Sequence, residues 1–162
     1  MPAQLKDLST YAWRAELSVG NDVIDGDHKV FFNLAEMFQN ASHDEENKIV
    51  IESVMSTLTE YVAGHFKREE LAMLSAEYPG LEAHMREHAR FTETLHQLMQ
   101  SYYAGSQGAT EKLGYTLAQW LTHHIEHIDH KYKDWIKEKD VDPRPLYEVA
   151  GCLKQDDIDE IW

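Results

Sequence analysis

Cysteine and positive charge are scarce in this 162-residue chain, and each scarcity argues against a class of protein. The single cysteine, Cys152, cannot form an internal disulfide, so a small disulfide-stapled domain is excluded. Lysine and arginine total 15 against 29 acidic residues, a formal net charge of −14. Such a charge repels phosphate backbones and anionic lipids, so we expect no nucleic-acid partner and no membrane partner.

Long apolar runs are also missing. No stretch approaches the roughly 18 consecutive apolar residues that a membrane-spanning helix needs. Residues 1–10 lack the cationic segment and the apolar run of a secretory signal. Together with the lone cysteine, these absences favour a soluble, cytoplasmic protein. The length fits one domain with a single core.

Apolar residues recur at helical spacing in four segments that turn-forming residues separate. A capping-box pattern, Ser42 with Glu45, precedes the second segment. Helices joined by short loops must run antiparallel to their neighbours. We therefore predict an all-α fold, an up-down-up-down antiparallel four-helix bundle, with helices at about residues 21–40, 51–69, 81–102 and 113–139.

Seven potential metal ligands fall at one end of this predicted bundle: His28, His65, Glu69, His84, His88, His124 and Asp129. Each histidine takes a position in its apolar stripe where leucine would be expected, so each ring points inward. A buried polar ring without a partner costs on the order of 1–3 kcal/mol. A metal ion removes this cost because it takes one ring nitrogen as a ligand. The pattern thus predicts a two-metal site at one end of the bundle.

The ligand spacing is regular on two helices and irregular on the last. His65 with Glu69, and His84 with His88, are four residues apart and share one helix face. On a regular helix Asp129 lies roughly 140° from His124, so the two approach from opposite flanks. Periodicity leaves His127 as an alternative to Asp129. We expect the remaining histidines and the acid beside Glu69 to be surface residues: His43, His96, His123, His127, His130 and Glu70.

Over about residues 11–137 the chain resembles the hemerythrins, most closely the bacterial ones. The resemblance rests on Trp13, Val19-Gly20, Ile24-Asp25, His28, His65-Phe66, Glu69-Glu70-Leu71, Met73, Tyr78-Pro79, His84, His88, Phe91, Trp120-Leu121, His124-Ile125 and Asp129. It implies that one iron is bound by His84, His88 and His124. The second iron would be bound by His28 and His65. Glu69 and Asp129 would bridge the two irons together with an oxo or hydroxo group.

The resemblance implies reversible dioxygen binding at the iron with two histidines, which is one ligand short. The protein would then be an oxygen carrier, store or delivery protein and not an enzyme. An oxygen-sensing or redox-sensing module, or a di-iron enzyme that consumes peroxide or nitric oxide, remains an alternative. Four apolar residues lie beside ligands or one turn from them, and we expect them to line the oxygen pocket: Phe66, Trp120, Leu121 and Ile125.

Two other metalloprotein classes fit the sequence less well. A ferritin-like oxidase needs two Glu-x-x-His pairs, and only Glu93 with His96 has that spacing. A zinc hydrolase of the His-Glu-x-x-His type is excluded because the chain has no such run.

The C-terminal segment lies outside the resemblance. We expect residues 1–139 to form the bundle and residues 140–162 to form an acidic extension, with seven acids against two bases. The extension also carries apolar residues, among them Leu146, Val149 and Trp162, which a disordered tail would hold in smaller number. It is either a strap packed on the bundle or a docking peptide for a protein partner. We expect a monomer or a small homo-oligomer.

Overall fold

The computed structural model describes residues 11–41 and 48–151, and every regular element in this part of the chain is helical. The predicted capping box at Ser42 and Glu45, together with His43, lies outside the described residues. The elements are η2 (Ala15–Leu17), α1 (Asp22–Ala41), α2 (Lys48–Ser75), α3 (Leu81–Tyr103), α4 (Ala109–His127), η4 (Asp129–Lys131), α5 (Lys133–Ile136) and α6 (Leu146–Gly151).

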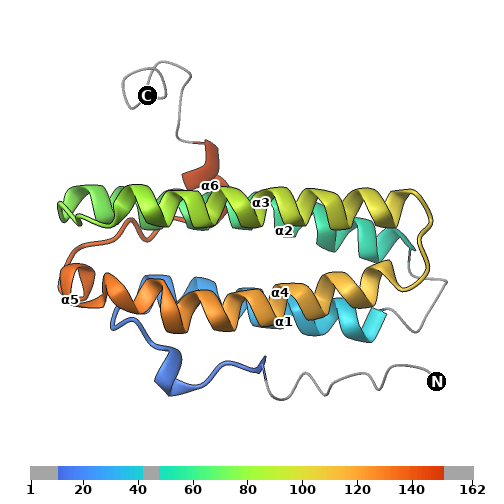
Figure 1. Cartoon of the computed structure of the whole chain (residues 1–162), viewed down its shortest axis with the longest axis horizontal. Coiled ribbons are helices and arrows are strands. Elements are labelled where there is room, and N and C mark those ends of the chain that lie inside the picture. The colour runs from blue at the N-terminus through green and yellow to red at the C-terminus, as the bar shows by residue number, and fades with distance from the viewer. Residues whose placement is uncertain (1–10, 42–47, 152–162) are drawn as a thin grey trace.

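The four long helices run alternately up and down, as Figure 1 shows. α1 packs chiefly against α4 and α2, and α3 packs against α4 and α2. The predicted all-α antiparallel four-helix bundle is therefore confirmed. None of the helices in the described residues combines the length and the apolarity that crossing a membrane requires.

The apolar stripes meet along the bundle axis. Phe38, Leu58, Leu95 and Leu117 each expose 2% or less of their surface, and they come from four different helices. Removing such side chains from water supplies the main driving force for packing amphipathic helices, about 1.5–3 kcal/mol for each large apolar side chain. The same stripes continue into the layer of predicted ligands at one end.

The last long helix is shorter than predicted. α4 ends at His127, and its C-cap residue Ile128 has φ −113° and ψ −59°, so φ lies well away from the usual helical value of about −63°. The tighter 3-10 turn η4 then begins at Asp129 and leads into the short α5. The prediction of one continuous helix to residue 139 is thus wrong, and the break decides where Asp129 points.

The chain returns from α5 to the outside of the bundle and packs on α2. We call residues 141–149 the C-terminal strap; Val141, Leu146 and Val149 in it are buried. A Cβ atom on Gly64 of α2 would stand 2.2 Å from the carbonyl oxygen of Leu146, so only glycine permits this approach. Figure 1 shows α6 lying across the α2 and α3 side of the bundle.

Candidate metal centre

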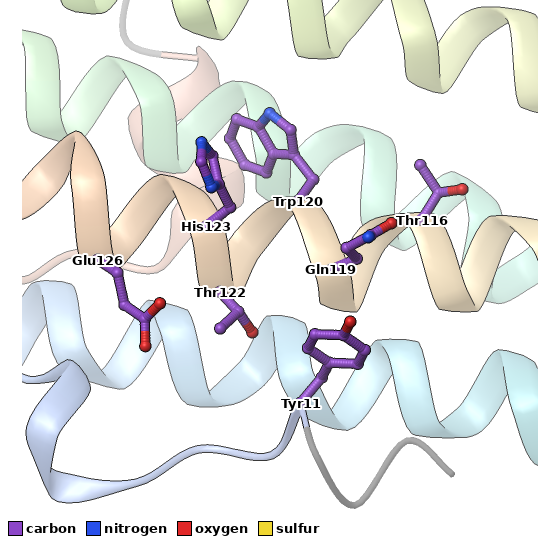
Figure 2. Close-up of a pocket in the computed structure, with 7 residues that line it drawn as sticks. All are labelled: Tyr11, Thr116, Gln119, Trp120, Thr122, His123 and Glu126. Carbon is purple, nitrogen blue, oxygen red and sulfur yellow. The ribbon is translucent and has the colours of Figure 1, made fainter. Parts of the chain in front are cut away.

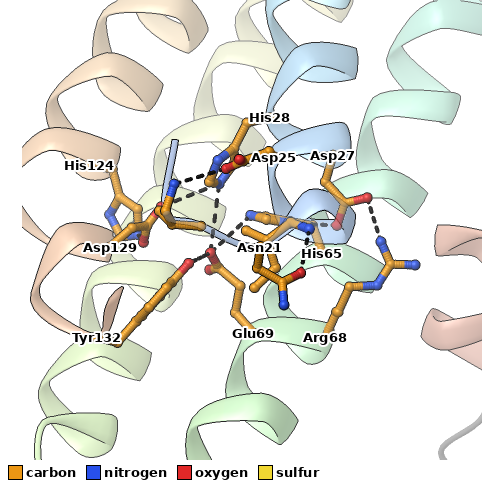
Figure 3. Close-up of polar contacts among 12 residues, drawn as sticks. Asn21, Asp25, Asp27, His28, His65, Arg68, Glu69, His124, Asp129 and Tyr132 are labelled. Carbon is orange, nitrogen blue, oxygen red and sulfur yellow. Dashed lines mark hydrogen bonds and ion pairs between the residues drawn. The ribbon is translucent and has the colours of Figure 1, made fainter. Parts of the chain in front are cut away.

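The structure brings the seven predicted ligand residues together at one end of the bundle. Figure 3 labels five of them, His28, His65, Glu69, His124 and Asp129. None of the seven exposes more than 3% of its surface. His28 comes from α1, the pair His65 and Glu69 from α2, the pair His84 and His88 from α3, and His124 from α4. Asp129 comes from η4. The cluster therefore collects donors from every long helix.

Glu69 divides its two carboxylate oxygens between two groups of histidines. Its Oε1 lies 3.7 Å from Nε2 of His28 and 3.4 Å from Nε2 of His65. Its Oε2 lies 3.6 Å from Nε2 of His84 and 3.1 Å from Nε2 of His88. A carboxylate so placed can bind two cations at once, one through each oxygen.

Asp129 divides its oxygens in the same way. Oδ2 lies 3.3 Å from Nε2 of His28, whereas Oδ1 lies 3.2 Å from Nε2 of His84 and 3.0 Å from Nε2 of His124. A regular helix would have carried Asp129 to the far flank of α4. The break at Ile128 turns it back toward His124, and the exposed His127 takes no part in the cluster.

Two sets of donors have ligand atoms close enough to hold a metal ion. One set is Glu69 with His84, His88 and His124, and the other is Glu69 with His28 and His65; within each set the ligand atoms lie within 4.8 Å of one another. The donors are imidazole nitrogens and carboxylate oxygens, which suit divalent first-row metals. Glu69 belongs to both sets.

Several buried polar atoms of the cluster have no hydrogen-bond partner among the described residues. They include Nε2 of His28 and of His88, Oε2 of Glu69 and both carboxylate oxygens of Asp129. Each such atom costs about 1–3 kcal/mol when it is left unsatisfied. In addition, Nε2 of His84 and Nε2 of His124 face each other at 3.3 Å. Two cations placed at the centre would satisfy the atoms that face it, so the residues present fit a two-metal site. Asp129 belongs to neither of the two donor sets above, and Nδ1 of His28 also has no partner among the described residues.

The electrostatics of the cluster favour cations. Burial alone lowers the pKa of His28, but Asp129 and Glu69 overcome this effect and raise it to about 10. The same balance raises the pKa of His84 to about 9. Burial tends to raise the pKa of Glu69 and Asp129, yet the surrounding histidines hold both well below their usual range. Two buried carboxylates thus attract protons or metal ions into the centre.

The hemerythrin HHE cation binding domain matches residues 19–136 of this chain. The chain belongs to the hemerythrin family. It is 30% identical over 125 residues to the bacteriohemerythrin of Pseudomonas paraeruginosa, a match that covers 77% of this chain and 80% of the relative. It is 29% identical over 130 residues to the bacteriohemerythrin of Stenotrophomonas maltophilia, covering 80% and 84%. A crystal structure of wild-type hemerythrin shares the fold, with a TM-score of 0.70 and 23% identity over 78% of this chain and 97% of that one.

Two histidines of the cluster are held by carboxylates outside it. Nδ1 of His65 lies 3.0 Å from Oδ2 of Asp27, and Nδ1 of His88 lies 2.8 Å from Oε1 of Glu70. A hydrogen bond at Nδ1 fixes the ring and leaves Nε2 free for a metal. The expectation that Glu70 is merely solvated is wrong, because its side chain is 21% exposed and bonded to His88.

Tyr132 is a buried residue of the site that the sequence patterns missed. Its hydroxyl donates a hydrogen bond to Oε1 of Glu69, and its ring stacks on His84 with centroids 5.4 Å apart. Burial, followed by the charges of Asp129 and Glu69, raises its pKa well above the usual value. The phenol therefore keeps its proton and orients the carboxylate that faces both histidine groups. No local signal marks this role, because the partner Glu69 lies 63 residues earlier in the sequence.

Local contacts before α1 position His28. The amide nitrogens of Val23 and Ile24 donate to Oδ1 of Asn21 at 3.2 and 3.3 Å, which caps the start of the helix. The amide of Val19 donates to Oδ1 of Asp25 at 2.9 Å and ties the preceding segment to the first turn. These bonds fix the turn that presents His28.

Aromatic rings cover the side of the hemerythrin centre formed by α3 and α4. Phe66 stacks on His88 with centroids 3.8 Å apart, and Trp120 stacks on His124 at 4.3 Å. Leu121 and Ile125 are buried in the same core.

Trp120 also forms part of the wall of a surface pocket of about 500 Å³, which Figure 2 shows. The pocket is lined by Tyr11, Thr116, Gln119, Trp120, Thr122, His123 and Glu126.

Proposed function

We propose that this hemerythrin holds two iron ions and binds dioxygen reversibly, as a carrier, store or delivery protein. His84, His88 and His124 would hold one iron, and His28 and His65 the other. Glu69 and Asp129 would bridge the irons together with an oxo or hydroxo group. The proposal depends on one observation. Glu69 and Asp129 each turn one oxygen toward the group that contains His28 and the other oxygen toward the group that contains His84.

The donor count supports a single position for an external ligand. Three imidazoles, one oxygen from each carboxylate and a bridging oxygen would give six donors for the first iron. Two imidazoles and three oxygen donors would give five for the second. Two ferrous ions, two carboxylates and a hydroxide sum to a net charge of +1, which a buried site tolerates better than bare cations. When bound, the ferrous pair supplies one electron from each ion to dioxygen and recovers both on release.

The protein's own residues keep the site dry and rigid. Phe66, Leu121, Ile125 and Trp120 would form the apolar lining of the oxygen pocket; all four are buried or half-buried, and the rings of Phe66 and Trp120 stack on His88 and His124. Excluding water from such a site slows the side reactions that would leave an oxidised, inactive centre. Tyr132 holds the bridging Glu69 through its hydroxyl. Positioning and water exclusion of this kind suit reversible binding better than turnover.

An oxygenation cycle tests the proposal and separates its alternatives. The protein is loaded with ferrous iron without air, exposed to air, and then purged with inert gas while the visible spectrum is recorded. A carrier gains and loses its oxygenated band over repeated cycles. Bleaching to the ferric form on first exposure would support sensing or turnover instead, and steady consumption of added peroxide or nitric oxide would support an enzyme.

A further inference from the structure

The C-terminal strap is connected to the candidate metal centre through a buried arginine. Arg68 lies on α2, three residues after His65, and exposes 3% of its surface. One terminal nitrogen, Nη1, donates to Oδ1 of Asp27, and the other, Nη2, donates to the backbone carbonyl of Arg144 in the strap. The other oxygen of Asp27 bonds to His65. Figure 3 shows Asp27 between His65 and Arg68.

We propose that Arg68 is a positioning residue that couples docking of the C-terminal strap to the iron held by His28 and His65. The inference rests on the proposed function, because it concerns the iron with the open position. Arg68 supports Asp27, Asp27 fixes the ring of His65, and His65 in turn would hold the iron.

Each charged side chain in this connection is held by a bond to the next group. Asp27 is 7% exposed and carries two bonds, one to a ligand histidine and one to a guanidinium. Taking away the strap carbonyl would leave a nitrogen of Arg68 without a partner in a buried place, which a charged group tolerates poorly. Arg68 would then turn to water, and Asp27 would lose the bond that sets its orientation.

The strap is built to present that carbonyl. Asp142 accepts a bond from the backbone amide of Arg144 at 3.0 Å and another from its Nε at 3.0 Å, which fixes the turn before α6. Val141, Leu146 and Val149 anchor the strap on the bundle. Leu146 makes its close approach at Gly64, one turn before Arg68 on the same face of α2.

Outer-sphere partners of metal ligands commonly change metal affinity by about 10–100-fold when they are mutated. Arg68→Met keeps an apolar stem but removes both hydrogen bonds. We therefore expect it to lower the affinity for one of the two irons by roughly tenfold. Gly64→Ala should act in the same direction, because its Cβ displaces the strap while Arg68 remains. Thermodynamic reciprocity requires that iron strengthens strap docking by the same factor.

Two measurements on the full chain test the coupling. The first follows iron release to a ferrous chelator from the anaerobically loaded protein. We expect Arg68→Met and Gly64→Ala to accelerate one of two release phases about tenfold and leave the other unchanged. Matched controls are Arg90→Met, an exposed arginine on α3, and Gly26→Ala, where a Cβ meets nothing within 4 Å. Both controls should release iron as the wild type does.

The second measurement is amide hydrogen exchange in the strap, which needs no oxygen binding. The amides of Glu148 and Val149 donate to the carbonyl of Pro145, and iron loading should slow their exchange in the wild type but not in Arg68→Met. If Arg68→Met does not fold, Gly64→Ala and the wild-type comparison decide. If neither substitution changes the rate of iron release or the amide exchange of the strap, the coupling is wrong while the proposed function stands. A wild type that holds fewer than two irons overturns both.

Discussion

In the metal-free protein, the free energy of unfolding should fall as pH rises from about 6.5 toward 10. Burial lowers the pKa of His28 and His84, but Asp129 and Glu69 raise these values to about 10 and about 9. An unfolded histidine titrates near pH 6.5. The folded, metal-free protein therefore binds more protons across this range. The stabilisation is complete below pH 6.5 and is lost as pH approaches the folded-state pKa values.

The size of the effect follows from the number of imidazoles involved. Each contributes a slope of up to about 1.4 kcal/mol per pH unit, so His28 and His84 together give at most about 3 kcal/mol per unit. A total stability of about 5–15 kcal/mol makes this a large change. The pKa of His88 is raised as well, so His88 adds to the slope. Burial lowers the pKa of His124, so its titration changes the stability only below pH 6.5. Iron reverses the trend, since binding requires neutral imidazoles and gains affinity as protons leave.

Urea unfolding of the metal-free chain, followed by circular dichroism between pH 6.5 and 9, measures the slope. His28→Gln should remove up to about 1.4 kcal/mol per pH unit of it. His96→Gln is the matched control, because His96 is exposed on α3 outside the cluster. Metal-free stability that stays level or rises across this range would refute the assignment of buried, carboxylate-paired histidines.

Three substitutions around the centre should separate the roles of its neighbours. Tyr132→Phe removes the hydroxyl bound to Glu69 and should lower the free energy of unfolding by about 1–3 kcal/mol in urea titrations. Glu70→Gln weakens the support of His88 and should reduce iron affinity by about 10–100-fold in chelator competition. Trp120→Ala opens the aromatic cover and should make the oxygenated band decay several-fold faster in air, as followed by visible absorption.

Each of these substitutions has a matched control at the surface. Tyr103→Phe should change stability by less than about 0.5 kcal/mol, since Tyr103 is 65% exposed. Glu93→Gln on α3 should leave iron affinity unchanged, and Trp135→Ala should leave the decay of the band unchanged. Equal effects in a variant and its control would contradict the role given to Tyr132, Glu70 or Trp120, respectively.

The bundle could be predicted because helical periodicity is read within each segment, and short connections make neighbouring helices antiparallel. The spacing of His65 with Glu69 and of His84 with His88 puts each pair on one helix face, and short connections put both pairs at one end. Gly105 and Gly108, both with φ above +70°, lie in the turn before α4 and are among the turn-forming residues that separate the predicted segments. None of these features depends on knowing which helices touch.

The position of Asp129 was predicted only as a flank of the last helix. No proline or glycine marks the break at Ile128, so the sequence carries no local signal that the helix ends there. Asp27, Arg68 and Tyr132 were also missed. Their partners are distant in the sequence, and contacts of that kind are set by how helices pack and not by spacing along one of them.

The most direct test of the account is the number of irons that the chain retains. Metal analysis of the anaerobically loaded and desalted protein should give two irons per wild-type chain. His65→Ala should retain one, because His84, His88 and His124 would still hold theirs, whereas His96→Ala should retain two. A wild type with no more than one ion, or a His65→Ala variant that keeps both, would contradict the proposal that these seven side chains hold a pair of metals.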